Sequence, residues 1–358
     1  MPFDSKSVIE VGKQSKRGPV KKILVTGGLG YIGSHVVVEL QTSGFEVIII
    51  DNLSNSSLNV LDGIVDITGV KPVFENIDLK ERNLVIDFFK RYSNIDGVIH
   101  FAASKAVDES VIDPLKYYEN NVNSLVYIIR ELQGLKSPKF VFSSSCTVYG
   151  QADQLPITEN APIKEPESPY GNTKKIGEQI IKDQCNCNDF FSAIALRYFN
   201  PIGAHSSAKI GELPIGVPQN LVPFVTQTAI GIRDKLSIFG RDYPTPDGTC
   251  IRDYIHVVDL AKAHIVALNR LFEEKKSDNY EVFNIGTGKG SSVLEVVYAF
   301  EKATGVNLNY CFTDRRDGDI VSAYAETTRA NKILGWKAQL SLEDALASAW
   351  NWEKSHKK

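Results

Sequence analysis

The sequence predicts an α/β protein in which a doubly wound parallel sheet carries a smaller C-terminal α/β domain. Short apolar stretches alternate with amphipathic stretches through the first 200 residues, which is typical of a parallel sheet with helices on both faces. A glycine-rich turn joins the first apolar stretch to the first amphipathic one. Glycine and proline are dense between Gly203 and Pro223, and regular alternation stops there, which indicates a second domain.

The individual elements follow in order along the chain. KKILVT (21–26) predicts a buried strand, YIGSHVVVELQTSG (31–44) predicts a helix ended by Gly44, and FEVIIID (45–51) predicts the next strand. Further strands are expected over GVIHFAA (97–103) and KFVFSSS (139–145), with a long helical stretch after Pro114 between them. The regular alternation of strands and helices is expected to end near FFSAIALRYFNP (190–201).

Composition excludes several classes of protein. The formal net charge is −3, with 40 Lys and Arg against 43 Asp and Glu, so a strongly basic nucleic-acid binder is excluded. No apolar run approaches the roughly 20 residues that span a bilayer, so no membrane segment is expected. Residues 1–20 mix charged and small residues, unlike a secretory signal, and are expected to form a disordered tail.

The cysteines indicate the compartment. There are five, an odd number, without a C-x-x-C pair or suitably spaced histidines. Free thiols in a reducing cytoplasm are therefore expected, with no disulfide frame and no metal site.

The glycine-rich turn predicts a nucleotide site. Gly27, Gly30 and Gly33 lie between a strand and a helix, where they permit a tight turn and close approach of the backbone to a pyrophosphate. Asp51 ends the next strand 18 residues after Gly33, close to the spacing of a carboxylate that binds an adenosine ribose. The following segment, from Asn52 to Ser57, has no arginine for a 2′-phosphate, which favours NAD over NADP. We therefore expect residues 21–199 to form a Rossmann-type NAD-binding domain.

A Y-x-x-x-K pair predicts the catalytic centre. Tyr170 and Lys174 share one face of an expected helix, so the ammonium can favour the ionised phenol. Ser145 ends a predicted parallel strand 25 positions earlier, at the sheet edge where ligands bind in open α/β folds. Tyr298 and Lys302 have the same spacing, but Tyr298 lies in an amphipathic helix and is expected to be a packing residue. His100, at the end of an apolar strand, is expected to be structural.

The order of the motifs identifies a resemblance. The glycine spacing G-x-x-G-x-x-G is similar to that of extended short-chain dehydrogenases/reductases. Residues 21–355 closely resemble the UDP-galactose 4-epimerases, also named UDP-glucose 4-epimerases. The motifs that carry this resemblance are TGGLGYIGSH, DNLSNSS, HFAASKAVDES, NNVNS, FSSSCTVYG, SPYGNTK, RYFNPIGAH, YPTPDGTCIRDYIHV and RRDGD.

The resemblance implies roles for residues in these motifs. Tyr170 would be the base that takes the proton of the sugar 4-hydroxyl, Lys174 would hold the nicotinamide ribose, and Ser145 would hydrogen-bond the 4-oxygen with Thr147 assisting. Asp78 would meet the adenine. Other residues expected at the cofactor are Tyr31, Ile32, Asn52, Phe101, Ala102, Lys105, Asn120 and Tyr198. The UDP group would be held by Asn200, Asn220, Arg252 and Arg316.

Two of these substrate residues have structural alternatives. Asn200 could cap a turn before Pro201, and Arg252 could pair with Asp253. Arginine suits a diphosphate because its guanidinium forms bidentate contacts. The smaller domain, residues 200–358, is accordingly expected to bind the UDP-sugar, with the chain crossing between the two domains.

The implied activity is reversible, NAD-dependent C4 epimerisation of UDP-galactose and UDP-glucose through a 4-keto sugar, an isomerase reaction of galactose metabolism. Ala323 stands where some relatives have a tyrosine near the sugar 2-position, so UDP-GalNAc and UDP-GlcNAc are also expected as substrates. The alternative is that Tyr324, one position along, fills that space. The resemblance further implies a homodimer formed through helices near 110–132 and 169–186.

Competing functions remain within and beyond this fold. UDP-xylose and UDP-glucuronate epimerases use the same chemistry. A 4,6-dehydratase would need an acid pair directly after Thr147, where the sequence has Val148 and Tyr149. A non-catalytic NAD-sensing protein would not need Tyr170, Lys174 and Ser145, all of which are present.

Overall fold

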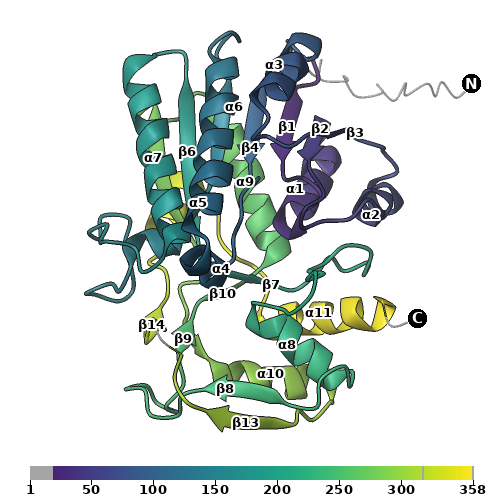
Figure 1. The fold of residues 1–358 in the computed structure, drawn as a ribbon, viewed down its shortest axis with the longest axis vertical. Helices are drawn as coiled ribbons and strands as arrows, with labels where there is room; N and C mark the ends of the chain where they lie inside the picture. Colours follow the sequence, from purple (N-terminus) through teal and green to yellow (C-terminus); the bar gives the residue numbers. More distant parts are fainter. Residues whose placement is uncertain (1–18, 317, 357–358) are drawn as a thin grey trace, which may run out of the picture.

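The computed structural model describes residues 19–316 and 318–356 (Figure 1). Residues 1–18 of the expected tail lie outside the described part of the chain. The largest element is a seven-stranded parallel sheet in the order β3-β2-β1-β4-β5-β6-β11. Its strands are β1 (Lys22–Thr26), β2 (Glu46–Asp51), β3 (Val73–Asn76), β4 (Gly97–His100), β5 (Lys139–Ser145), β6 (Ser192–Tyr198) and β11 (Tyr280–Ile285).

Apolar side chains on both faces of the sheet explain why these segments form strands. In β1, Ile23 and Val25 belong to one buried cluster and Leu24 to another. Because successive side chains of a strand point to opposite faces, the two clusters are the two sides of the sheet. The α/β class with a doubly wound parallel sheet is confirmed.

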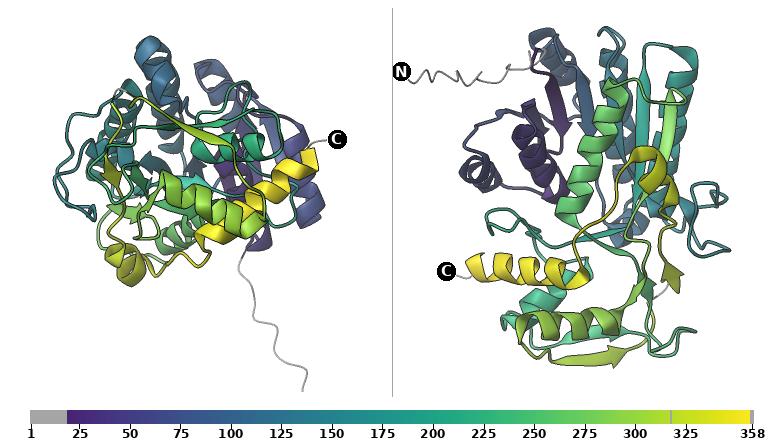
Figure 2. Two further views of the ribbon diagram at one scale, coloured as in Figure 1. Left: turned by 90° about the horizontal axis from the view of Figure 1, so that it is seen from below. Right: turned by 180° about the vertical axis from the view of Figure 1, so that it is seen from behind.

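Helices cover both faces (Figure 2). One cluster contains side chains from α1 (Tyr31–Thr42), α2 (Asn59–Thr68) and α9 (Val257–Phe272). The other contains side chains from α3 (Arg82–Arg91), α6 (Ser124–Leu132) and α7 (Pro169–Cys187). The helical stretch expected after Pro114 consists of α5 (Pro114–Tyr117), a π-helical segment η1 (Tyr118–Asn123) and α6, preceded by the short α4 (Val107–Ile112).

A smaller unit lies beyond the carboxyl ends of the strands (Figure 1). Its core joins Val222 and Val225 to Val297, Phe300 and Leu346. Two helical turns belong with the large sheet: η2 (Cys146–Tyr149) follows β5 and contacts α7, and η3 (Ala330–Leu334) packs against α9 and β11. The helices of the smaller unit are α8 (Leu221–Ala229), α10 (Val293–Thr304) and α11 (Leu342–His356). Its short strands form three small sheets. Two of them are pairs, β7 (Asn200–Ile202) with β10 (Tyr254–His256) and β8 (Leu236–Phe239) with β13 (Tyr310–Thr313). In the third, β9 (Ile251–Arg252) lies between β12 (Ser291–Ser292) and β14 (Ser322–Ala323).

The chain crosses more than once between the two units. After β7 and α8 in the smaller unit, α9 and β11 return to the large sheet, where β11 pairs with β6 in parallel from Tyr280 to Ile285. Loops at the carboxyl ends of the strands therefore face segments of the smaller unit. No helix within residues 19–316 and 318–356 is long and apolar enough to cross a membrane.

Candidate active site

The glycine-rich turn packs against the loop that follows β4. Gly27 has φ +68°, and a Cβ atom there would lie 2.9 Å from the Ala102 backbone nitrogen. A Cβ atom on Gly33 would lie 2.2 Å from the Gly27 carbonyl oxygen, so the start of α1 lies directly against the turn. Gly30 precedes α1 and has no side-chain cap, which leaves the helix N-terminus suited to an anion.

Asp51 lies beside this turn at the end of β2. Its carboxylate is buried and accepts hydrogen bonds from Leu29 N at 3.1 Å and Leu53 N at 2.9 Å. The Ser56 hydroxyl donates a third bond at 2.8 Å. These contacts hold the carboxylate at the carboxyl edge of the sheet, where the sequence places a ribose-binding group.

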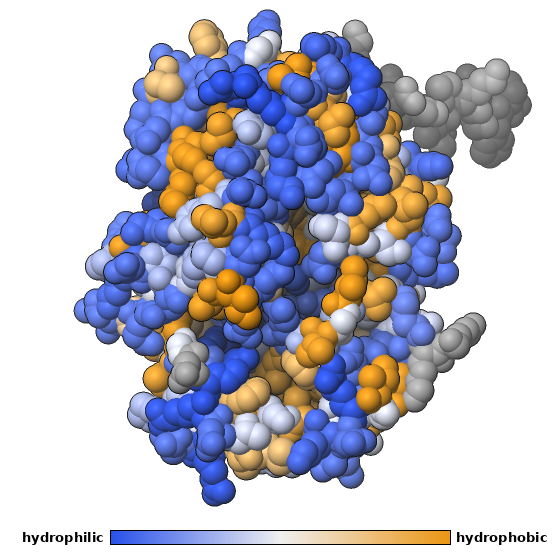
Figure 3. All heavy atoms as spheres, in the orientation of Figure 1, coloured by the Kyte–Doolittle hydropathy of each residue, from blue (hydrophilic) through white to orange (hydrophobic). Residues whose placement is uncertain are grey.

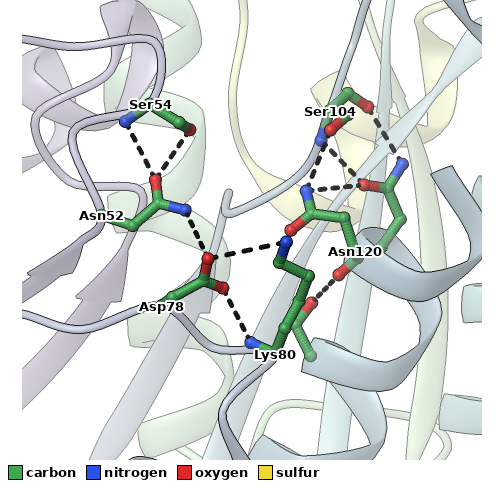
Figure 4. Close-up of polar contacts among 8 residues, drawn as sticks. Asn52, Ser54, Asp78, Lys80, Ser104 and Asn120 are labelled. Carbon is green, nitrogen blue, oxygen red and sulfur yellow. Dashed lines mark hydrogen bonds and ion pairs between the residues drawn. The ribbon is translucent and has the colours of Figure 1, made fainter. Parts of the chain in front are cut away.

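Polar residues after β2 and β3 continue the same edge (Figure 4). Asn52 donates its side-chain amide to Asp78 at 3.3 Å. Asp78 also accepts the Lys80 backbone N–H at 2.9 Å, and the Lys80 ammonium lies 3.7 Å away. The structure thus brings Asn52 and Asp78 together, as expected for two residues that meet one nucleotide.

The two residues after Gly30 point in different directions. The Tyr31 hydroxyl donates to the Gly203 carbonyl at 2.6 Å and so links the glycine-rich turn to the smaller unit. Ile32 packs against the core on the α1 side of the sheet.

The loop after β4 carries three of the expected cofactor residues. The strand expected over 97–103 ends at His100, because Phe101 N and Ala102 N turn to the backbone and side-chain oxygens of Thr26, at 3.0 Å and 3.3 Å. The Phe101 ring packs on His264, with ring centroids 4.8 Å apart. The Lys105 ammonium lies 3.5 Å from Glu212 in the smaller unit.

Asn120 lies in the π-helical segment η1 and donates to the Ser104 hydroxyl at 3.0 Å (Figure 4). Its neighbour Asn121, which sequence reasoning missed, is buried and binds both backbone groups of Ser104. Asn121 also donates to Thr173 on α7 at 3.0 Å. The NNV motif therefore joins the loop after β4 to the helix that carries Tyr170 and Lys174.

Ser145 and Tyr170 meet at the carboxyl end of β5. The Ser145 hydroxyl accepts hydrogen bonds from Thr147 Oγ1 at 2.9 Å and Thr147 N at 3.2 Å. Tyr170 is in the first turn of α7, which begins at Pro169 after the Ser168 cap. Burial is the largest effect on Tyr170 and raises its pKa, whereas a hydrogen bond with Ser145 lowers it.

Lys174 is buried one turn along α7 from Tyr170. Its ammonium donates to the Ser143 carbonyl at 2.7 Å and lies 5.9 Å from the centroid of the Tyr170 ring. Burial lowers the Lys174 pKa to about 8, and the carboxylate of Glu178 opposes that shift. The ammonium and the phenol of the Y-x-x-x-K pair therefore lie one helical turn apart on α7, as the sequence predicts.

Tyr198 completes this group from β6. It is the register partner of Ser145, and its hydroxyl lies 2.5 Å from Ser143 Oγ. Burial raises its pKa to about 12, so it remains neutral at physiological pH.

Two arginines converge on one carboxylate in the smaller unit. Arg316 contacts Asp319 through Nε at 3.2 Å and Nη2 at 3.1 Å, and Arg252 Nη2 lies 3.8 Å from the same carboxylate. The alternative pairing of Arg252 with Asp253 is wrong, because Asp253 is buried and accepts hydrogen bonds from Thr287 and from the backbone of Gly288 and Ala325. Two guanidinium groups sharing one carboxylate leave net positive charge for an anion.

The two expected asparagines lie in different elements of the smaller unit, Asn200 in β7 and Asn220 directly before α8. Asn200 is a residue of β7, and its backbone N–H donates to the Asp253 carbonyl at 2.9 Å, so the alternative of a turn cap is wrong. Asn220 donates its amide to Glu212 at 2.6 Å. Glu212 thus lies between Asn220 and the ammonium of Lys105 and joins the expected cofactor and substrate residues.

Ala323 is 7% exposed in β14 and packs in a cluster with Val148, Tyr149 and Phe199. The side chain at position 323 thus packs with the turn that follows Ser145. Tyr324 turns elsewhere: a Cβ atom built on Gly290 would lie 3.0 Å from its ring. Ala323 and Tyr324 therefore contact different neighbours.

Sequence reasoning also missed Asp319 and Glu212, which contact the expected substrate residues. The only sequence signal for Asp319 was a carboxylate within a basic motif, R-R-D-G-D. His100 is buried with a pKa lowered to about 3, as expected for a structural histidine. Tyr298, expected to pack in its helix, is 54% exposed because the buried side chains of α10 include Val296, Val297 and Phe300 on another face.

Comparison with known proteins agrees with this geometry. The sequence profile of the NAD dependent epimerase/dehydratase family matches residues 23–286. The chain belongs to this family. Within the epimerase family it is 49% identical over 334 residues to the UDP-glucose 4-epimerase of Bacillus subtilis, covering 93% of this chain and 97% of that protein. The Drosophila melanogaster UDP-glucose 4-epimerase is 45% identical over 337 residues, with 92% and 96% covered.

Solved epimerase structures have the same fold. A UDP-glucose-4-epimerase from Stenotrophomonas maltophila, with bound NAD and formylated UDP-arabinopyranose, superposes with a TM-score of 0.89 at 44% identity, covering 94% of this chain and 98% of that one. The Bifidobacterium longum UDP-glucose 4-epimerase, in complex with NAD+ and UDP, gives 0.89 at 43% identity, with 94% and 99% covered. The resemblance inferred from the motifs is confirmed.

Proposed function

We propose that this chain interconverts UDP-galactose and UDP-glucose by NAD-dependent epimerisation at C4. The observation that carries the proposal is the convergence of Ser145, Tyr170 and Lys174 at the carboxyl end of β5, on the same sheet edge as the glycine-rich turn. Close relatives named UDP-glucose 4-epimerase support the same reaction. The enzyme is accordingly an isomerase.

The residues present fit NAD. The close packing of Gly33 on Gly27, where a Cβ atom would clash, and the uncapped start of α1 form a cradle for a pyrophosphate. Asp51 would bind the adenosine ribose, and Asn52 and Asp78 would lie near the adenine. Bound NAD would supply the acceptor and donor of the C4 hydrogen. Around it we also place Gly30, Tyr31, Ile32, Phe101, Ala102, Lys105, Asn120 and Tyr198.

Residues of this chain would transfer the proton of the sugar 4-hydroxyl. Tyr170 would remove the proton of the sugar 4-hydroxyl and later return it, while Ser145 and Thr147 hydrogen-bond the 4-oxygen. Lys174 would stabilise the ionised phenol, since a phenol with a pKa near 10 is a poor base at neutral pH. Loss of the hydroxyl proton together with the C4 hydride would make C4 a planar ketone. Return of the hydride to the opposite face of the sugar would invert the centre.

We propose that the smaller unit binds the UDP group and is the UDP-sugar domain. Arg252 and Arg316 would hold the diphosphate by exchanging part of their contact with Asp319 for phosphate oxygens. Asn200 and Asn220 would complete the grip on the nucleotide. A firm hold on UDP allows the uncharged keto sugar to turn over while attached.

We extend the proposal to UDP-GalNAc and UDP-GlcNAc. Ala323 packs close to the turn after Ser145 and has no bulk to exclude an acetamido group, while Tyr324 is directed toward Gly290. UDP-xylose and UDP-glucuronate epimerisation stay as second candidates, because their chemistry needs the same three residues. A 4,6-dehydratase is disfavoured because Val148 and Tyr149 follow Thr147 and are buried.

We also propose a homodimer in the cytoplasm. Val111, Ile112 and Leu115 lie in the segment expected at the dimer interface and are 61%, 84% and 71% exposed. Apolar side chains gather on the face that carries α4 to α7 (Figure 3), and exposed apolar patches of this kind mark interaction sites. Five free cysteines fit a reducing compartment.

The test is to incubate the purified protein with UDP-galactose, without added cofactor, and to identify the sugar product. Formation of UDP-glucose, with NAD(H) released in near-stoichiometric amount on denaturation, supports the proposal. Activity that requires added NADP, or an active protein that releases no NAD(H), would contradict it.

A further inference from the structure

A buried ion pair lies behind the catalytic group. Glu178 follows Lys174 by one turn of α7, and its carboxylate accepts Arg197 Nε at 2.8 Å and Arg197 Nη2 at 2.5 Å. The two side chains are 6% and 5% exposed. Neither residue takes part in the proposed proton transfer.

The pair is connected to the strands that carry the catalytic residues. The Ser144 hydroxyl donates to Glu178, and Ser144 and Arg197 are register partners on β5 and β6. The next pair in the same register is Ser145 and Tyr198. One carboxylate on the catalytic helix therefore holds the two strand residues that directly precede Ser145 and Tyr198.

The network continues to the turn beyond Ser145. Arg197 Nη1 donates to the Tyr149 hydroxyl at 2.9 Å, and that hydroxyl donates to Asn284 on β11 at 2.7 Å. Tyr149 belongs to η2, the turn that also contains Thr147. Three strands, one turn and α7 thus meet in a single set of side-chain hydrogen bonds.

We propose that Glu178 and Arg197 are positioning residues, which hold Tyr170 and Lys174 on α7 in register with Ser145 on β5 for the proposed epimerisation. A buried ion pair contributes little net stability over apolar packing, so its value at this place is geometric. The Glu178 carboxylate also supplies negative charge beside the buried ammonium of Lys174.

Other titratable groups around this part of α7 do not change charge near neutral pH. Burial lowers the pKa of His100 to about 3 and raises the pKa values of Cys146, Tyr149 and Tyr198 to about 12. Burial also raises the pKa values of Tyr117 and Tyr280, and contact with Glu178 raises the pKa of Arg197 against the effect of burial. Apart from Tyr170, Lys174 is the group here whose titration a pH profile would report.

The test compares Glu178→Gln with Glu281→Gln. Glu281 forms a similar bidentate pair with Arg270, at 2.7 Å and 2.8 Å, with side chains 1% and 11% exposed. This pair lies at the start of β11, at the amino ends of the strands and away from the proposed site. Both variants should lose several degrees of Tm. Glu178→Gln should also lower kcat for UDP-galactose about 10-fold or more with little change in KM, and should move the alkaline limb of kcat about one pH unit toward acid. Glu281→Gln should do neither.

A second pair of variants with smaller changes tests the proposal if Glu178→Gln fails to fold. Ser144→Ala removes the hydrogen bond from β5 to Glu178, whereas Ser192→Ala removes a buried hydroxyl on β6 that has no hydrogen-bond partner among the residues the structure describes. Ser144→Ala should lower kcat several-fold, and Ser192→Ala should not. If the wild type is active and neither Glu178→Gln nor Ser144→Ala lowers kcat more than its control, the positioning role is wrong; a wild type without epimerase activity contradicts the function instead.

Discussion

The Lys174 ammonium lies 5.9 Å from the centroid of the Tyr170 ring, while its hydrogen bond goes to the Ser143 carbonyl. In the proposed mechanism, Lys174 would therefore act on the phenol through its charge rather than by a direct hydrogen bond. Burial raises the pKa of Tyr170, so the phenol is protonated unless nearby positive charge offsets that effect.

Tyr170→Phe should reduce turnover of UDP-galactose by at least about 100-fold, because it removes the proton acceptor and little volume. Binding of UDP should be unchanged, since Arg252 and Arg316 are untouched. Steady-state kinetics and calorimetric titration with UDP measure the two effects. Tyr298→Phe is the control and should be nearly silent, because Tyr298 is exposed on α10; more than a few per cent of activity in Tyr170→Phe would contradict its role.

Gly33→Ala should strongly reduce the NAD that copurifies with the protein. The new Cβ atom would lie 2.2 Å from the Gly27 carbonyl oxygen, so the turn must shift. Gly134→Ala is the matched control, because its Cβ atom would be 3.5 Å from the Glu131 carbonyl oxygen, an ordinary contact. Cofactor released on denaturation is quantified for both variants; equal NAD content would show that the turn does not bind the pyrophosphate.

Ala323→Tyr should lose activity on UDP-GalNAc and UDP-GlcNAc while keeping most of its activity on UDP-galactose. The ring would enter the space left by alanine beside Val148 and Phe199. Comparison of kcat/KM for both substrate pairs, in wild type and variant, measures the change in selectivity. A wild type that does not turn over UDP-GalNAc would refute the wider specificity.

The protein should become less stable as the pH falls below about 6.5. Burial lowers the pKa of His35 and His100 to about 3 and that of His256 and His264 to about 4, so the folded state keeps these groups neutral. The unfolded chain binds their protons below its ordinary pKa of about 6.5, so each histidine removes about 1.4 kcal/mol per pH unit until its folded pKa is reached. Above pH 6.5 these groups have no effect.

Urea unfolding at pH 7, 6 and 5 measures this dependence. His264→Gln keeps a donor for the Leu260 carbonyl but does not titrate. Its free energy of unfolding should therefore fall less steeply between pH 6 and 5 than that of the wild type. The difference in slope should be about 1.4 kcal/mol per pH unit, the contribution of one bound proton. Parallel slopes would mean that His264 is not held neutral in the fold.

The fold could be predicted from sequence wherever local pattern decides it. Apolar strands, the glycine-rich turn and the Y-x-x-x-K helix all carry short-range signals, and the structure has them within a few residues of the expected bounds. The return of β11 to β6 carries no such signal, because strand order depends on contacts across nearly 90 residues of sequence.

The sequence predicts which residues form the site better than it predicts which residues they contact. Asp51, Ser145, Tyr170 and Lys174 stand at strand ends or helix starts, which sequence position reveals. The partner of Arg252 is Asp319, 67 residues away, rather than the adjacent Asp253. Such pairs form through the packing of β9 and β14, which no local pattern reports.

The late position of β11 in the chain affects synthesis of the protein. When the ribosome has made residue 199, six of the seven sheet strands exist, but β6 still has a free edge from Ser192 to Tyr198. That edge is buried in the finished protein and its unpaired backbone groups are exposed in the nascent chain, so it is prone to aggregation until Ile285 leaves the exit tunnel. Codon usage or chaperone binding between residues 200 and 285 should therefore influence the yield of soluble protein more than changes after residue 300.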